Sequence, residues 1–340
     1  MKNIKIKKQK EEVATRRTVI IALLTLLVTA ISLTTSTYAW FTANATVTLG
    51  SLDVNVTASN GIQISMDATN WKASLTTVDI KDVAYTGHTN QVPTALVPVS
   101  SGADIDPLTG FMDMYKGAVT SNVTEGYNIL TATKTTEAAD GTGIAGTTGD
   151  FIAFDLFIQT ADAETLYLTP GADVVFQDTD VGLKNSARFA LLDEGNVPVG
   201  STAAAAQALI GATEVILWEP NANVHTAAGV IAALDVYGIV TSPTGPSLPS
   251  YYGVSAPIAV LDDRQLNSTD AAFFNQLSPS VSPSVQRVEG SAAFTQILTI
   301  LPGVTKVRVY GWIEGQDVDC ENNASGSDIT FNIKLSKNNI

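Results

Sequence analysis

Apolar and polar residues alternate along much of the chain, and this alternation predicts a protein built mainly of β-strands. The clearest case is the stretch 41–49, where every second residue is apolar and each residue between them is threonine or asparagine. Strict alternation over a stretch of this length is typical of a strand with one buried face. The residues expected on that face are Phe41, Ala43, Ala45, Val47 and Leu49.

The alternation resumes after Gly50, and the pair Asn60-Gly61 predicts a hairpin turn before the apolar stretch 62–66. Further strands are predicted wherever a short apolar or alternating stretch is bounded by turn residues. These strands are 151–159, 164–168, 173–177, 187–192, 214–218, 293–300, 306–314 and 328–335.

Two short helices are predicted in the connections between strands. Residues 202–210 are rich in alanine, with Ser201 as the expected N-cap and Gly211 as the stop, and Asp270 is the expected cap of a helix at 271–277. Neither helix is long enough to organise a fold. Many short strands with small helices in the loops favour an all-β protein, an antiparallel β-sandwich of jelly-roll type.

Residues 51–340 are interpreted as a single domain of this type. The stretch 131–149 is rich in threonine, alanine and glycine and is expected to be a mobile surface loop. Two stretches rich in proline and serine, 242–250 and 278–284, bracket a region with little core pattern. Residues 221–288 are therefore interpreted as an elaboration on one edge of the sandwich, where proline discourages unwanted strand pairing.

The first part of the chain has the pattern of an export signal. A basic stretch, 2–17, precedes an uncharged apolar stretch, 19–33, and small residues follow at Thr37 and Ala39. This order is typical of a signal peptide cleaved after Ala39, so that 1–39 is removed and the mature chain begins at Trp40. Counted through Phe41, the apolar stretch reaches the ~20 residues of a membrane span, so an uncleaved anchor is the alternative.

Composition narrows the function further. The chain has a net charge of −14, with its basic residues concentrated before the predicted cleavage site, which excludes nucleic acid as a partner. With 45% hydrophobic residues the chain is able to bury a real core. Few charges and many Ser, Thr, Asn and Gly residues suit a secreted protein, extracellular or at the cell surface.

Residues for catalysis are scarce. The chain has two histidines, His88 and His225, neither with a second His or Cys at metal-ligand spacing, and both are expected in surface loops. No hydrolase elbow, phosphate-binding loop or zinc-peptidase motif is present. The sequence thus predicts no enzyme, no catalytic residues, no cofactor and no metal site.

Two features leave alternatives open. The lone Cys320 is interpreted as a small buried apolar residue, with an intermolecular disulfide as the alternative. Acidic groups are able to bind Ca²⁺ from loops, although none has the EF-hand spacing. These groups are Asp104 and Asp106, Asp178 and Asp180, Asp262 and Asp263, and the stretch 314–319.

The segment 37–41, Thr-Tyr-Ala-Trp-Phe, and the segment 45–54, which ends in Gly-Ser-Leu-Asp-Val, resemble the start of the TasA/camelysin family of secreted bacterial proteins. The resemblance covers about 20 residues. It implies a jelly-roll subunit of biofilm-matrix fibres that polymerises head-to-tail as a homopolymer, sometimes with accessory fibre proteins. In such fibres the N-terminal segment of one subunit inserts as a strand into the next. Some members are classed as metallopeptidases, but this chain has no zinc-binding motif.

The residues themselves agree with strand donation. Cleavage leaves 40–50 as a free N-terminal strand, which cannot pair its backbone or bury its apolar face alone. Docked on a neighbour, it would do both by β-strand addition, through Trp40 and the five inward-facing residues of 41–49. The opposing interpretation is that the strand pairs within its own sheet. A membrane-anchored adhesin or envelope protein is the second functional hypothesis, and a camelysin-like metallopeptidase is the third.

Overall fold

The structure, a computed structural model, is mostly β, with mixed and antiparallel sheets and short helices in the connections. The predicted signal peptide, 1–39, and residues 40–45 lie outside the described residues. The structure describes residues 46–57, 61–81, 83, 85, 87, 90–122, 124–125, 127–135, 148–176, 182–212, 214–222, 224–227, 229–231, 252–262, 274–276, 284–290, 292–317, 319–320 and 328–337.

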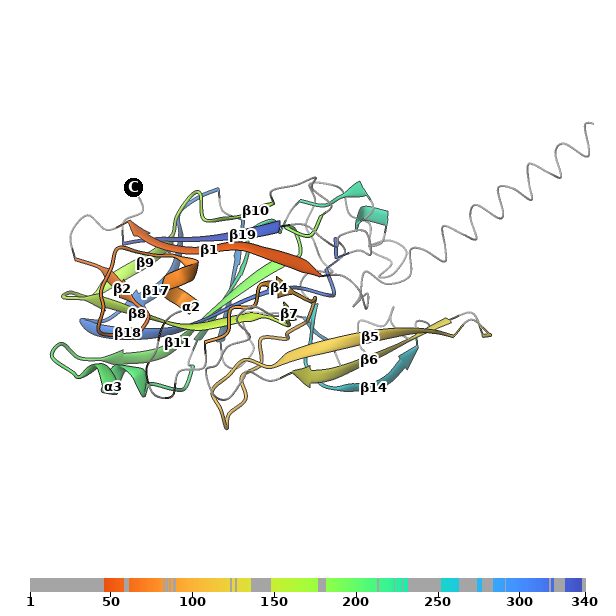
Figure 1. The fold of residues 1–340 in the computed structure, drawn as a ribbon, viewed down its shortest axis with the longest axis horizontal. Coiled ribbons are helices and arrows are strands. Elements are labelled where there is room, and N and C mark those ends of the chain that lie inside the picture. The colour runs from red at the N-terminus through yellow and green to blue at the C-terminus, as the bar shows by residue number, and fades with distance from the viewer. Residues whose placement is uncertain are drawn as a thin grey trace, which may run out of the picture. The chain divides into compact units, whose positions relative to one another are not determined.

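Two large sheets form the body of the described chain (Figure 1). The first, the β1 sheet, has the order β17-β9-β19-β1-β4-β7, with β10 also beside β19 and β3 also beside β1. Its strands are β1 (Val47–Thr57), β3 (Ser74–Leu75), β4 (Ala95–Leu96), β7 (Thr148–Gly149), β9 (Glu164–Leu168), β10 (Asp173–Phe176), β17 (Thr295–Ile300) and β19 (Asp328–Ser336).

The second sheet, the β18 sheet, has the order β16-β12-β11-β18-β8-β2. Its strands are β2 (Gln63–Ser65), β8 (Ile152–Thr160), β11 (Ala187–Val197), β12 (Glu214–Glu219), β16 (Ser284–Glu289) and β18 (Gly303–Ile313). Helix α2 (Thr77–Lys81) follows β3 in the chain, and helix α3 (Ala203–Gln207) follows β11.

The two sheets face one another across one large apolar core. Phe331 of the β1 sheet meets Phe189 of the β18 sheet edge to face, with ring centroids 4.9 Å apart, and Phe189 stacks on Trp218 at 5.1 Å. Alternate residues of each strand fill this core, as Leu52 and Val54 do in β1. Face-to-face packing of two alternating sheets explains why period-two patterning located the strands.

The β18 sheet is buried on its second face as well. Residues 99–114 cover that face, where Met112 and Met114 pack with Phe151, Tyr310 and Trp312. A strand covered on both sides reads as a continuous apolar stretch, as β8 does. This cover was not predicted, because residues 99–114 have no regular period of their own.

Smaller sheets complete the described part. β5 (Met114–Asn122), β6 (Tyr127–Thr135) and β14 (Ile258–Asp262) pair in the order β14-β6-β5, and β13 (Tyr252–Val254) pairs with β15 (Phe274–Gln276). The paired strands β5 and β6 lie together in Figure 1.

The eight strands predicted between 151 and 335 are all present, with ends shifted by a few residues. The prediction of a purely antiparallel sandwich is wrong, because β1 runs parallel to β19 and β12 parallel to β16. These partners lie far apart in sequence, and long crossovers permit parallel pairing, whereas tight turns do not.

Several local predictions are also wrong. The hairpin at Asn60-Gly61 does not form, since β1 and β2 belong to different sheets. Residues 274–276 of the predicted second helix are strand β15, because their backbone pairs with β13. The first residues of the predicted loop 131–149 continue β6, and the N-cap of α3 is Thr202 rather than Ser201, because the Thr202 hydroxyl accepts from Ala205 N–H at 3.2 Å.

Candidate functional site

The residues predicted to form the donated strand fall into two groups. Trp40, Phe41, Ala43 and Ala45 lie outside the described residues. Val47 and Leu49 lie in β1, 0% and 8% exposed, and belong to the core between the two sheets. Within the single chain, Val47 and Leu49 are therefore core residues of their own sheet rather than part of an unpaired strand.

The start of β1 is held on both sides. Thr48 is paired with Asp328 of β19, Val47 is paired with Leu96 of β4, and the Leu49 N–H donates to the Thr94 carbonyl at 2.8 Å. Beyond Leu96 the chain turns away from β1, and Val99 N–H donates to Ile313 O of the β18 sheet at 3.0 Å. Among the described residues, no strand of the β1 sheet extends past Val47 toward residue 41.

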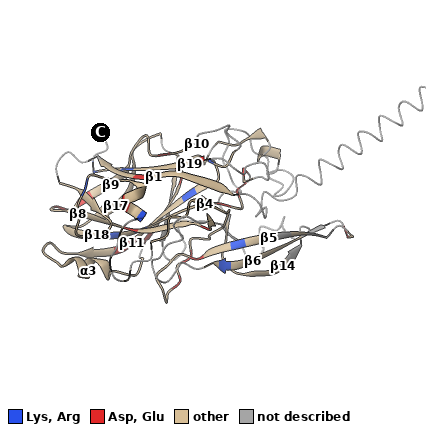
Figure 2. Cartoon of the chain, viewed as in Figure 1, with Lys and Arg blue, Asp and Glu red and all other residues tan. Residues whose placement is uncertain are grey.

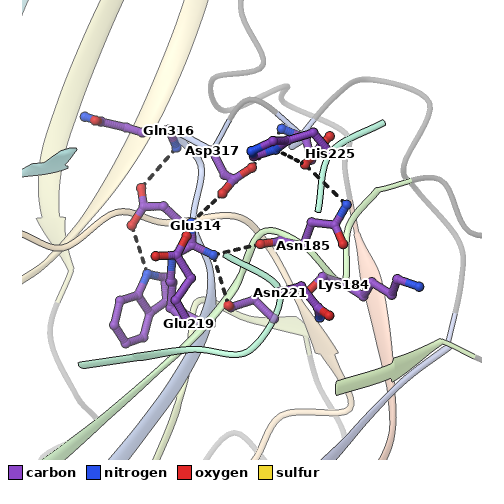
Figure 3. Close-up of polar contacts among 12 residues, drawn as sticks. Lys184, Asn185, Glu219, Asn221, His225, Glu314, Gln316 and Asp317 are labelled. Atoms are coloured by element: carbon purple, nitrogen blue, oxygen red, sulfur yellow. Dashed lines mark hydrogen bonds and ion pairs between the residues drawn. The ribbon is translucent and has the colours of Figure 1, made fainter. Parts of the chain in front are cut away.

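A buried charge cluster lies where β11, β12 and β18 meet, and it consists of Arg188, Glu219, His225, Glu314, Asp317 and Asp319. Figure 3 labels Glu219, His225, Glu314 and Asp317 of this cluster. The sheet topology explains the convergence. β11 is antiparallel to β12 and to β18, so its first residues lie beside the last residues of both neighbours. Turns after β18 then direct three carboxylates inward, with Asp317 N–H donating to Glu314 O at 3.1 Å.

Arg188 is the central cation of the cluster. Its guanidinium is 1% exposed, pairs with Glu219 Oε1 at 2.6 Å and with Asp317, and donates to the Asn185 and Ala187 carbonyls at 2.8 and 3.0 Å. Burial lowers the pKa of Arg188, but the charges of Glu219 and Asp317 outweigh it and raise that pKa, so the group stays protonated. One side chain thus joins β11 to the ends of β12 and β18.

Asp319 joins the same strand ends to the segment that follows β12. Its carboxylate accepts from the Thr226 N–H and hydroxyl, both at 2.8 Å, and lies 2.9 Å from His225 Nδ1. Burial lowers the pKa of His225, but the hydrogen bond to Asp319 and the nearby carboxylates outweigh it and raise that pKa. The prediction that His225 lies in a surface loop is wrong, because this contact buries it to 6% exposure.

Glu314 is a buried carboxyl group of the cluster whose pKa is raised. Burial raises its pKa to about 7, although it accepts from Trp312 Nε1 at 3.0 Å and from Gln316 N–H at 3.0 Å. Burial also raises the pKa of Asp317, more than the Arg188 charge lowers it. Two carboxyl groups of the cluster therefore take up protons more readily than exposed ones.

The cluster has the chemistry of a buried structural junction. Its members are at most 6% exposed, and the nearby Cys320 is 1% exposed, as predicted for a small apolar residue. Burial raises the pKa of the Cys320 thiol far above its usual value, which keeps it protonated and poorly nucleophilic. The junction is able to bind protons near neutral pH, and its ion pairs hold the strand ends together.

A second buried ion group lies on the far face of the β18 sheet. Asp155 of β8 accepts from Arg308 Nη1 at 2.7 Å, pairs with Lys306 at 3.3 Å, and is hydrogen-bonded to Tyr85. Burial raises the pKa of Asp155, but the charges of Arg308 and Lys306 outweigh it and lower that pKa. By contrast, Lys116, the blue residue of β5 in Figure 2, has 48% of its side chain exposed and pairs with Asp150 at 2.8 Å.

Some of the acidic residues considered for Ca²⁺ pair with cationic side chains, and others lie outside the described residues. Asp106 pairs with Lys134 of β6 at 2.9 Å, and the carboxylates of 314–319 surround Arg188 and His225. His88, Asp178, Asp180 and Asp263 are not described. Within the described chain, no three His, Cys, Asp or Glu side chains are grouped so as to hold a metal ion.

Sequence reasoning missed the charge cluster, although a signal for it exists. Arg188 stands within the apolar stretch ARFALL of β11, and Glu219 is the last residue of β12, EVILWE. A charge in a buried strand requires a partner. The sequence does not show which charges pair, because the partners are 31 to 129 residues apart and meet only through sheet topology.

Comparison with models of protein families, with curated proteins and with solved structures finds no match. None of the helices in the described ranges is long and apolar enough to cross a membrane.

Proposed function

We propose that the chain is a non-enzymatic structural subunit of an extracellular bacterial filament, released by removal of 1–39. It joins its neighbour head-to-tail through the segment that precedes β1. A jelly-roll fold, which the resemblance to the TasA/camelysin family implies, is part of this proposal. The proposal concerns residues 40–46, since Val47 and Leu49 are core residues of their own domain.

One observation carries the proposal. The buried positions Val47 and Leu49 are in phase with Phe41, Ala43 and Ala45, so the apolar face of β1 continues in the sequence beyond the first paired residue. β4 leaves β1 at Leu96, and β19 begins opposite Thr48. An apolar, strand-forming segment is thus present where the described part of its own sheet offers no partner.

Strand addition to a second copy satisfies this segment. Its backbone N–H and C=O groups require partners once they leave water, and an edge or groove of another subunit supplies them. The contact joins the N-terminal segment of one subunit to a different surface of the next subunit. Such a contact does not close on itself, so repetition produces a filament.

The test compares substitutions on the two faces of the segment, in the protein that begins at Trp40. Phe41→Asp places a charge on the apolar face and should leave monomers, because burying an unpaired charge is costly. Thr42→Asp places the same charge on the polar face and should still give filaments. Size-exclusion chromatography with light scattering and negative-stain microscopy measure the outcome, and circular dichroism checks that both variants fold.

Filaments formed by a chain that lacks 40–45 would overturn the proposal. Val47→Asp is unsuitable for this test, because Val47 is 0% exposed in its own core and the change would unfold the monomer. Sequencing the N-terminus of cell-surface material tests release: Trp40 as the first residue supports it, while an intact Met1 supports the membrane-anchored adhesin or envelope protein instead.

A further inference from the structure

A pocket of about 510 Å³ lies beside α2. Met66 and Leu75 line its interior, and both are core residues of the sandwich, at most 4% exposed. Val78 of α2, 64% exposed, also lines it, as do the side chains of Asp67 and Asp79. The volume falls in the range of ligand pockets, about 300–1,000 Å³. Half of the lining residues are apolar, and these would continue the core into an apolar group that entered.

The pocket lies toward the end of β1 that is farthest from residues 40–46. β3 is paired with β1 at Val54 and Asn55, and Thr77 of α2 exchanges hydrogen bonds with the Leu52 backbone, at 2.8 and 3.1 Å. Figure 1 shows α2 and β2 toward the end of the sheet at which β1 finishes. The N-terminal segment leaves from the opposite end, at Val47.

The segment of the same chain leaves β1 in the direction away from the pocket. Thr77 of α2 is bonded to Leu52, and Val47 and Leu52 are separated by about 17 Å along the strand, at ~3.3 Å per residue. Residues 40–46 span about 23 Å when fully extended, so the segment would have to reverse direction at Val47 and run back over its own sheet to arrive there. We therefore expect an occupant with this sequence to come from a second copy.

The end of the segment matches the pocket in chemistry. Trp40 and Phe41 supply two large apolar side chains for an apolar interior, and signal-peptide cleavage gives Trp40 a positive α-amino group. The pocket carries two carboxylates, Asp67 and Asp79, against one ammonium, Lys72, which pairs with Asp79. This surplus of negative charge favours a cationic chain end.

We propose that this pocket receives the Trp40-Phe41 end of the next subunit in the filament. The inference rests on the proposed function and adds the location of the acceptor. It places the donated segment and the acceptor pocket at opposite ends of β1, and this geometry permits head-to-tail assembly.

The first experiment uses the mature chain with a substitution at the pocket. Val78→Arg fills the opening and brings a positive charge against the incoming amino group, so filaments should be lost. Val78 is largely exposed, so the fold should tolerate the change. The matched control is Val199→Arg, at another exposed valine, 70% exposed and not among the residues that line the pocket, which should assemble normally.

The second experiment is a crosslink between two populations of the mature chain. One carries Phe41→Cys and the other Val78→Cys, and oxidation after co-assembly should give covalent dimers. Val199→Cys replaces Val78→Cys in the control and should give none. The native Cys320 is 1% exposed and does not compete. A chain carrying both Phe41→Cys and Val78→Cys should crosslink between chains, and a bond within one monomer would overturn the proposal.

The outcomes separate the two proposals. If Phe41→Asp abolishes filaments while Val78→Arg leaves them intact, the segment is donated but this pocket is not its acceptor. If neither change affects assembly, both the pocket assignment and the proposed function are wrong. Loss of filaments with Val78→Arg, together with the intermolecular crosslink, supports both.

Discussion

Arg188 is the residue on which the buried charge cluster depends. It contacts Glu219 at 2.6 Å and also Asp317, and all three side chains are 1% exposed. Replacing Arg188 with methionine keeps an apolar stem but leaves two buried carboxylates without their cation. We expect a loss of about 3–5 kcal/mol in the free energy of unfolding, measured by urea denaturation.

The control for Arg188 is Lys116→Met. Lys116 pairs with Asp150 at 2.8 Å but has 48% of its side chain exposed, and surface pairs contribute roughly 0–1 kcal/mol. Equal effects of the two substitutions would contradict the view that Arg188 holds the strand ends together.

At the level of residues, the sequence predicted which residues are buried better than it predicted which residues contact one another. The inward positions of β1 followed from alternation, and Cys320 was predicted to be buried and is. His225 was assigned to a surface loop because no second His or Cys stands at metal-ligand spacing from it. Its burial depends on Asp319, 94 residues away, a contact that no local pattern encodes.

At the level of elements, Gly303 shows how closely strands approach at the start of β18. Its φ is +122°, and a Cβ added there would lie 2.0 Å from the Val197 carbonyl oxygen of β11. Gly303→Ala therefore requires a shift of backbone in addition to an unfavourable φ. We expect a loss of roughly 2–4 kcal/mol, from overpacking together with backbone strain, measured by urea denaturation.

Gly200→Ala is the matched control for Gly303. Its φ is also positive, +87°, but nothing lies within 4 Å of an added Cβ. It should cost only the backbone strain, about 1 kcal/mol. If the two alanine variants lose the same stability, the close approach to Val197 is not what fixes the start of β18.

The extent of the elements was predictable, but their partners were not. Strands β8, β9 and β12 have strong local signals, namely apolar content and bounding turn residues. The parallel pairing of β1 with β19 joins the first and last described strands, and it is set by the packing of whole sheets. The cover on the second face of the β18 sheet is equally non-local.

At the level of the whole molecule, several buried titratable groups have raised pKa values, while the pKa of Asp155 is lowered. Burial raises the pKa of Glu314 and of Glu194 to about 7, and it also raises that of Asp317. For His225, burial is outweighed by Asp319 and neighbouring carboxylates, and its pKa is raised as well. The folded state therefore binds more protons than the unfolded state between about pH 4.5 and 8.

We therefore expect stability to fall as pH rises through this range. Burying a carboxyl group whose pKa is raised does not lower the free energy of unfolding below its pKa in the unfolded chain, near 4.5. The loss of stability is largest above its pKa in the folded chain, about 7. The contribution of His225 is complete below its ordinary pKa of 6.5 and is lost as pH rises through its folded value. Asp155 has a lowered pKa, so its contribution is lost only in stronger acid, below 3.8.

The measurement is the urea midpoint from pH 5 to pH 8.5, in the native chain and in Glu194→Gln. Glu194 Oε2 accepts from Gly211 N–H at 3.1 Å, and its Oε1 has no hydrogen-bond partner in the described chain, so glutamine keeps the one contact. The free energy of unfolding of Glu194→Gln should equal that of the native chain at pH 5. At pH 8.5 it should be higher by about 2–3 kcal/mol, because the pKa of Glu194 is raised from 4.5 to about 7.

The control repeats the series in 0.5 M salt, where the Debye length is about 4–5 Å. Salt at this concentration screens repulsion between surface charges but does not remove the cost of burying a charge. A midpoint that rises with pH, or a slope that salt abolishes, would show that surface charge rather than the buried groups governs the stability of this molecule.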